Sequence, residues 1–322
     1  MTNIGATARK QLILFIAAIA ALALGGLSQA AIAQEAVETA ESEAVVEAPA
    51  YTPLGPDMIK GQPVPGGIDV QPQFSALGQE AYGLHMGLVW VMVIISLFVL
   101  GLLLWVMIRY NKRANPVPSK TSHNTLIEVL WTVVPVLILV AIAVPSMRLL
   151  ANQYETPPED ALTVKVTGYQ WYWGYTYPDN GGFEVISNMM PEDEAIEKGF
   201  PAQLEVDNRM VLPVGVPIRL QTTAADVIHS FAVPAIWFKI DAVPGRLNER
   251  IMQIDEPGIY YGQCSELCGA RHGYMPIAVE AVPMEQFQAW ILSKGGTLGG
   301  EEEAATETPA DEAAAEEPAP AA

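Results

Sequence analysis

Both cysteines of the 322-residue chain lie in one short stretch, YGQCSELCGARHGYMP, together with a histidine and a methionine. Cys264 and Cys268 are followed by His272 and Met275, so the pattern is C-x3-C-x3-H-x2-M. Thiolate, imidazole and thioether are ligands that suit copper. Two cysteines outside the cytoplasm can instead form a disulfide, but a disulfide needs no histidine or methionine at fixed short spacing. The pattern therefore favours a copper site, with a disulfide as the alternative.

A blue-copper ligand set also needs a second histidine on a neighbouring strand. His229, in the β-like run Asp226–Phe231, precedes Cys264 by 35 residues and meets this need. The other two of the four histidines, His85 and His123, lie at apolar membrane segments. Because one copper needs only one thiolate, two thiolates in one loop can bridge two coppers, which then share an added electron. Such sharing keeps ligand rearrangement small on a rigid β scaffold.

The second half of the chain has the sequence pattern of a β domain. Thr163–Thr167 alternates as a half-buried strand does, and aromatic residues at every second position from Tyr169 to Tyr177 continue one face. A turn is predicted at 178–182 and a short closing helix at 284–294. Further short strands are predicted near 203–206, 217–223, 227–233, 249–254 and 276–282. Regular short strands separated by Gly and Pro indicate a sandwich or barrel.

Two apolar runs are long enough to cross a membrane. Leu88–Ile108 has 21 residues without a charge and Val129–Met147 has 19, close to the roughly 20 residues that a span needs. Residues 109–127 between them contain four basic residues and no acid, which predicts a cytoplasmic linker with both mature ends outside. A pair of buried soluble helices is the alternative, but a soluble helix of this length normally has a polar face.

The first 33 residues have the pattern of a secretory signal peptide. Arg9 and Lys10 precede the apolar stretch Gln11–Leu27, and Ala31–Ala33 supplies small residues for cleavage. A third membrane span is the alternative. The short apolar stretch and its small-residue exit favour a cleaved signal.

The formal net charge of −19 comes partly from the two ends of the chain. Residues 34–50 carry five Glu and residues 301–322 carry eight acids, with no base in either segment. Both segments are therefore predicted to be solvated, disordered tails. The region 151–300 still has 19 acids against nine bases. This balance argues against nucleic acid as a partner and is compatible with a basic protein partner.

Four motifs give the chain a resemblance, over about residues 67–290, to subunit II of cytochrome c oxidase, the haem–copper respiratory enzyme. They are Gln170–Trp173, Asp226–Pro234, Lys239–Arg246 and Tyr261–Gly269. The resemblance implies a membrane protein with a two-helix transmembrane hairpin plus an all-β cupredoxin-type sandwich that carries the dinuclear copper centre CuA. The domains expected on this basis are a signal peptide at 1–33, a periplasmic N-terminal segment at 34–80, the hairpin at 81–152, the CuA domain at 153–295 and an acidic disordered tail at 296–322.

The resemblance also implies how the copper would be held. Cys264 and Cys268 would bridge two copper ions, and His229 and His272 would each bind one of them. Met275 would be a weak ligand on one side of the pair. The backbone carbonyl of the residue at position 266 would be the weak ligand on the other side.

Other implied roles concern partners and a second metal. The side chain of Glu266 would bind a magnesium ion shared with subunit I, and a carboxylate is the hard donor that magnesium prefers. Trp171 would be the residue by which electrons enter, and Asp226 would help to dock cytochrome c. Thr176 stands where family members often have an acid, so the docking patch is expected to shift towards Asp179 or Glu184.

Glu128, at the cytoplasmic start of the second apolar run, is an ionisable group beside the bilayer core and so a functional candidate. By resemblance it marks the mouth of a proton-uptake channel in the partner subunit, with His123 close by. The alternative is an interfacial carboxylate that reaches water.

The resemblance predicts an electron-entry subunit of a proton-pumping oxidase in the bacterial inner membrane, with both mature ends and the CuA domain periplasmic. Its partners would be subunit I and the other oxidase subunits, cytochrome c and membrane lipid. The chain has no C-x-x-C-H haem attachment motif, so the electron donor would be separate. The competing hypotheses are a copper-delivery protein, a quinol-oxidising relative and a nitrous oxide reductase. The enclosed ligand set argues against a copper-delivery protein, and the intact ligands argue against a quinol-oxidising relative. Two spans without a second catalytic domain argue against a nitrous oxide reductase.

Overall fold

The computed structural model describes residues 50–299. The predicted signal peptide, most of the acidic segment 34–50 and the acidic tail 301–322 lie outside these residues. The described part contains a helical hairpin and a two-sheet β domain.

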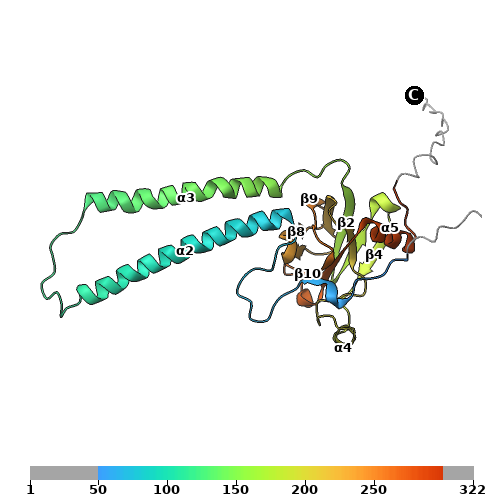
Figure 1. Ribbon diagram of the computed structural model, residues 1–322, viewed down its shortest axis with the longest axis horizontal. Coiled ribbons are helices and arrows are strands. Elements are labelled where there is room, and N and C mark those ends of the chain that lie inside the picture. The colour runs from blue at the N-terminus through green and yellow to red at the C-terminus, as the bar shows by residue number, and fades with distance from the viewer. Residues whose placement is uncertain (1–49, 300–322) are drawn as a thin grey trace, which may run out of the picture. The chain divides into compact units, whose positions relative to one another are not determined.

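The hairpin consists of α2 (Ala76–Arg109) and α3 (Thr125–Gln153), which cover and extend both predicted spans (Figure 1). Most large apolar side chains along both helices are exposed, as expected for surfaces that face lipid or partner helices. The 34 residues of α2 span about 50 Å, more than the roughly 30 Å of a hydrocarbon core. The helix therefore extends beyond the membrane. Near the start of α2, Glu80 Oε2 accepts a hydrogen bond of 2.8 Å from Asn152 Nδ2, near the end of α3.

Side chains define where the two helices begin. Ser75 Oγ accepts from the backbone amide of Gly78 and donates to the Ile236 carbonyl at 2.9 Å, so the same residue caps α2 and contacts the β domain. Asn124 Oδ1 accepts from two backbone amides at the start of α3. Such caps satisfy amides that have no partner inside the helix.

Two sheets form the predicted sandwich. One has the order β5-β11-β10-β7-β8, with β1 added on β10, and the other has the order β4-β3-β2-β6-β9. The first contains β1 (Ile59–Gly61), β5 (Met210–Pro213), β7 (His229–Val233), β8 (Phe238–Ala242), β10 (Gly258–Cys264) and β11 (Pro276–Val282). The second contains β2 (Leu162–Tyr169), β3 (Tyr172–Thr176), β4 (Glu184–Ser187), β6 (Ile218–Ala224) and β9 (Asn248–Met252).

Short helices complete the β domain. They are α4 (Glu192–Glu197), α5 (Met284–Ser293) and the 3-10 turns η1 (Pro56–Met58), η2 (Pro178–Asn180), η3 (Pro234–Ile236) and η4 (His272–Tyr274). The closing helix predicted at 284–294 and the turn predicted at 178–182 are confirmed by α5 and η2.

Aromatic side chains fill the space between the sheets. Trp173, Tyr175 and Tyr177 are fully buried, as their alternation predicted. Trp173 and Tyr175 meet Phe231 of the other sheet edge to face, with ring centroids 5.6 and 6.5 Å apart. Aromatic rings prefer such offset arrangements, so these contacts fix how the two sheets stack beside the metal-ligand region.

Two details of the predicted strand pattern are wrong. The segment 203–206 is a turn rather than a strand, because Gln203 adopts a φ of 63° and only Val206 makes an isolated bridge. The aromatic run 169–177 is not one strand but the β2–β3 hairpin, which turns at Gln170 and Trp171. A third difference is that five strands, β1, β4, β5, β8 and β10, were not predicted, although β10 ends at Cys264.

Candidate metal centre

Two antiparallel strands bring the first pair of donors together. His229 is the first residue of β7 and Cys264 is the last residue of β10, and Cys264 pairs with Phe231 on β7. Antiparallel pairing places the end of one strand beside the start of the other. The loop from 265 to 275 then carries Cys268, His272 and Met275 back over the same end of the sandwich before β11 begins.

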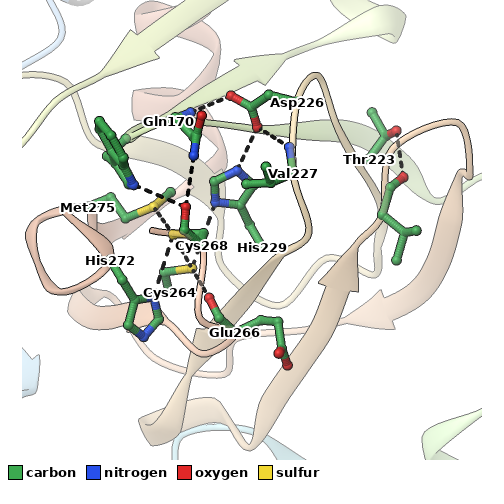
Figure 2. Close-up of polar contacts among 12 residues, drawn as sticks. Gln170, Thr223, Asp226, Val227, His229, Cys264, Glu266, Cys268, His272 and Met275 are labelled. Atoms are coloured by element: carbon green, nitrogen blue, oxygen red, sulfur yellow. Dashed lines mark hydrogen bonds and ion pairs between the residues drawn. The ribbon is translucent and has the colours of Figure 1, made fainter. Parts of the chain in front are cut away.

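The donor atoms of this loop and of His229 converge (Figure 2). Cys264 Sγ lies 3.8 Å from Cys268 Sγ and 4.0 Å from His229 Nδ1. Cys268 Sγ lies 3.6 Å from His272 Nδ1 and 3.5 Å from Met275 Sδ. The donors of His229, Cys264 and Cys268 all lie within 4.8 Å of one another. The structure therefore brings together all five predicted side-chain ligands.

These separations fit metal coordination and not a disulfide. Two donors bound at 2.0–2.3 Å to one ion with tetrahedral angles lie roughly 3.3–3.8 Å apart, which matches the distances around Cys268. A disulfide needs about 2.05 Å between sulfurs, whereas both cysteines are free thiols. Each histidine lies beside a different sulfur, an arrangement that suits two ions bridged by the sulfur pair.

The electrostatics of the sulfur pair also favour bound cations. Burial raises the pKa of the Cys264 thiol, but hydrogen bonds from His229 and from the backbone at Glu266 outweigh it and lower this pKa to about 6. Burial and the negative charge on Cys264 raise the pKa of Cys268. One thiolate therefore opposes the formation of the other. A metal ion removes this conflict because a coordinating thiol is deprotonated outright.

His229 is held rigidly from several sides. Its side chain is completely buried, and Trp173 meets the ring edge to face with centroids 5.9 Å apart. A Cβ at Gly168 would lie 2.8 Å from the His229 ring, so glycine is required for the imidazole to fit. The Nε2 atom is 2.9 Å from Asp226 Oδ1. This contact leaves Nδ1 to face Cys264.

Trp171 lies against the backbone of the ligand loop. Its Nε1 donates to the Cys268 carbonyl at 3.3 Å, and Gln170 Nε2 donates to the same oxygen at 3.0 Å. A Cβ at Gly269 would lie 3.1 Å from Trp171 Cζ2. The half-buried indole is thus in contact with a residue that bears one of the thiols. Gln170 was not predicted as a site residue, although its place beside Trp171 in a family motif was a signal.

The remaining predicted site residues lie in different settings. The Glu266 carbonyl oxygen is 3.3 Å from Cys264 Sγ, while its carboxylate points away from the sulfurs (Figure 2). Asp226 is only 32% exposed at its side chain. Partial burial opposes its ionisation, but hydrogen bonds from His229 and from two backbone amides hold its pKa below the usual value. Glu128 lies on α3 and accepts from the Asn124 amide at 3.3 Å, which is a capping contact.

Comparisons with known proteins agree on one family. Residues 162–282 match the family model described as cytochrome c oxidase subunit II, periplasmic domain, and residues 63–149 match the transmembrane domain of the same subunit. The chain is 52% identical over 236 residues to the probable cytochrome c oxidase subunit 2 of Rickettsia felis, covering 73% of this chain and 74% of the relative. It is 43% identical over 256 residues to cytochrome c oxidase subunit 2 of Cereibacter sphaeroides, covering 74% of this chain and 84% of the relative.

The chain is also similar to a solved structure. The crystal structure of the periplasmic domain of subunit II of cytochrome oxidase of Bradyrhizobium japonicum is 50% identical, covers 44% of this chain and 97% of that one, and has a TM-score of 0.40.

Proposed function

The chain belongs to the cytochrome c oxidase subunit II family, and we propose that it is the electron-entry subunit of the oxidase. It takes electrons from reduced cytochrome c and delivers them to haem in subunit I, where oxygen is reduced to water with proton pumping. The observation that carries this proposal is the convergence of two thiols, two imidazoles and a thioether at one end of the sandwich.

The residues would hold two copper ions as the CuA centre. Cys264 and Cys268 would bridge the ions, His229 and His272 would each bind one, and Met275 would be a weak ligand. The Glu266 carbonyl would be the second weak ligand, and the Glu266 carboxylate, which faces away from the sulfurs, is free to bind magnesium shared with subunit I. When bound, the copper pair supplies reversible one-electron chemistry. The chain itself supplies a stiff frame, because its ligands come from strand ends and one loop on a packed sandwich.

Partner contacts follow from the same arrangement. Asp226 would contribute negative potential for a cytochrome c whose haem edge is surrounded by lysines, and such complementarity chiefly raises the rate of encounter. Glu128 would mark the mouth of a proton-uptake channel in subunit I. The two spans and the basic linker support a two-pass protein of the bacterial inner membrane with the metal domain in the periplasm. The domain boundaries given above remain predictions.

The proposal is tested by the copper content of the purified oxidase that contains this chain. We expect two coppers per chain in addition to any copper in subunit I, and a seven-line EPR signal from one unpaired electron shared by two copper nuclei. A single-copper signal, or two cysteines joined in a disulfide without metal, would rule out the electron-entry function. A single exchangeable copper would support a copper-delivery protein instead.

Replacing Trp171 by leucine is expected to slow electron intake from cytochrome c by about a factor of ten or more, with little change in KM. The indole provides a flat contact for a haem edge and touches the Cys268 carbonyl. Stopped-flow oxidation of cytochrome c measures the rate, and EPR verifies that the copper centre is intact. Tyr172→Leu is the matched control and should leave the rate of electron intake unchanged. Tyr172 is the next aromatic residue, but it stacks on Tyr169, with ring centroids 4.7 Å apart. Equal rates in the wild type and the Trp171 variant would remove Trp171 from the pathway.

A further inference from the structure

The carboxylate of Asp226 binds inward to the protein with both of its oxygens. Oδ1 lies 2.9 Å from His229 Nε2 and accepts from the Val227 amide at 2.6 Å. Oδ2 accepts from the Gln170 amide at 2.7 Å. A carboxylate used only to attract a basic partner would point its oxygens to solvent. Asp226 instead connects the start of β7 to the β2–β3 turn (Figure 2).

The contact with His229 determines which ring nitrogen can bind metal. A carboxylate accepts hydrogen bonds, so His229 donates from Nε2–H. The neutral imidazole then carries its lone pair on Nδ1, which faces Cys264 Sγ at 4.0 Å. A partner on the second nitrogen commonly fixes the tautomer and the ring orientation of a metal-binding histidine. The His229 side chain is completely buried, so in the folded site Nε2 meets Asp226 and not solvent.

Gln170 extends the connection to the loop backbone at Cys268, the residue that carries the second thiol. Its backbone amide binds Asp226, and its side-chain Nε2 donates to the Cys268 carbonyl. Trp171 donates to that same carbonyl. A continuous series of hydrogen bonds therefore joins His229, the turn that carries Trp171 and the loop that carries Cys268.

We propose that Asp226 and Gln170 are positioning residues that hold His229 and Trp171 in register with the two thiols. We name the contacts His229–Asp226–Gln170–Cys268 the Asp226 bridge. The Asp226 bridge fixes the imidazole so that Nδ1 faces the sulfurs, and it keeps the indole against the ligand loop. The inference rests on the proposed function, since it concerns how this chain holds the copper pair. Any contribution of Asp226 to docking is separate and comes from its exposed edge.

Two substitutions distinguish positioning from docking. Asp226→Asn and Asp226→Ala both remove the negative charge, so a docking role predicts the same rise in KM and the same weaker salt dependence for both. Asparagine retains an oxygen that can accept from Nε2–H, whereas alanine does not. Positioning therefore predicts that alanine is clearly worse than asparagine.

The measurement uses the purified oxidase complex that carries each variant. We expect Asp226→Ala to lose copper to a chelator about 10- to 100-fold faster than the wild type, with a changed nitrogen hyperfine coupling in the copper EPR signal. In both readouts, Asp226→Asn should lie between the wild type and Asp226→Ala. Asp193→Asn, an equal charge change on exposed α4, should leave both readouts unchanged.

Each outcome has a distinct meaning. If Asp226→Ala retains copper and nitrogen coupling like the wild type and changes only KM, the positioning role is refuted. If Asp226→Ala does not assemble, Asp226→Val, which also lacks an acceptor but fills more of the side-chain volume, is measured in its place, and wild-type copper retention and coupling in that variant refute the role equally. If the wild-type complex contains no paired copper, the proposed function itself fails, and this result is seen before any variant is compared.

Discussion

Replacement of Cys264 by serine is expected to abolish the paired-copper EPR signal and to reduce electron intake from cytochrome c to background. A serine hydroxyl is a hard, neutral donor at neutral pH and cannot replace a bridging thiolate. Cys264 contacts Cys268, His229 and the Glu266 carbonyl, so its loss removes the common partner of three groups. Copper analysis, EPR and stopped-flow reduction of the purified oxidase measure the result.

Two further variants make the Cys264 result specific. Ser265→Ala changes the next residue, whose exposed hydroxyl donates to the β10 backbone at Gln263, and should retain the signal. Cys264→Ser combined with Cys268→Ser should be no worse than Cys264→Ser alone, because residues that act as one unit are not additive. A Cys264→Ser oxidase that keeps two coppers and normal electron intake would contradict the bridging role.

The convergence of the candidate ligands could be predicted from the sequence because most of them are close together in the chain. Cys264, Cys268, His272 and Met275 lie within twelve residues, so one loop brings them together whatever the details of the fold. His229 was harder, since its contact depends on the pairing of β7 with β10. It was found because few histidines were available and because it lies in a β-like run. The family motifs then indicated Trp171 and the carbonyl of Glu266.

The hairpin was predicted more securely than its ends. A charge-free run predicts only the residues that cross the lipid, whereas the helix itself begins at the residue whose side chain caps it. Ser75 caps α2 well before the apolar run at Leu88 begins. Polar and apolar residues alternate at 203–206, as in a half-buried strand, although the segment is a turn. In the structure Glu205 is 1% exposed.

The side-chain contacts of buried polar residues could not be predicted from the sequence, whether the partners are near or far along the chain. Asp226 was interpreted as a surface acid, since the short spacing to His229 gives no sign that the carboxylate turns back to Nε2. The partners of Arg209 were equally hidden, because one of them is 71 residues away on β11. Charge patterns identify which residues are ionisable, but the fold alone determines which of them meet in the interior.

A buried ionic cluster around Arg209 leads to the second large expected effect. Arg209 makes two hydrogen bonds to Glu205, at 2.9 and 2.8 Å, and one to Glu280 at 3.0 Å. The Arg209 side chain is 10% exposed and each carboxylate is 1% exposed. Tyr261 donates to Glu205 and Tyr51 donates to Glu280. The cluster therefore connects β10, β11 and the segment before β1 to the start of β5.

Replacing Arg209 by methionine is expected to lower the free energy of unfolding of the β domain by about 3–5 kcal/mol, because two buried carboxylates lose their cation. Methionine keeps most of the side-chain volume, so the loss of charge dominates. Guanidinium unfolding of the purified chain, followed by tryptophan fluorescence, measures the shift in midpoint. The proposed copper ligands lie outside this cluster, so paired copper should still form in the folded fraction.

Arg219→Met is the matched control for this buried cluster. Arg219 pairs with Glu249 at 3.2 Å, but these side chains are 23% and 31% exposed, and exposed pairs contribute about 0–1 kcal/mol. Adding Glu205→Gln and Glu280→Gln to Arg209→Met should restore part of the stability, because no uncompensated charge then remains buried. Equal midpoints for the Arg209 and Arg219 variants would show that the buried cation is dispensable. Restoration by the two neutral side chains would instead show that the cost arises from stranded carboxylates and not from lost packing.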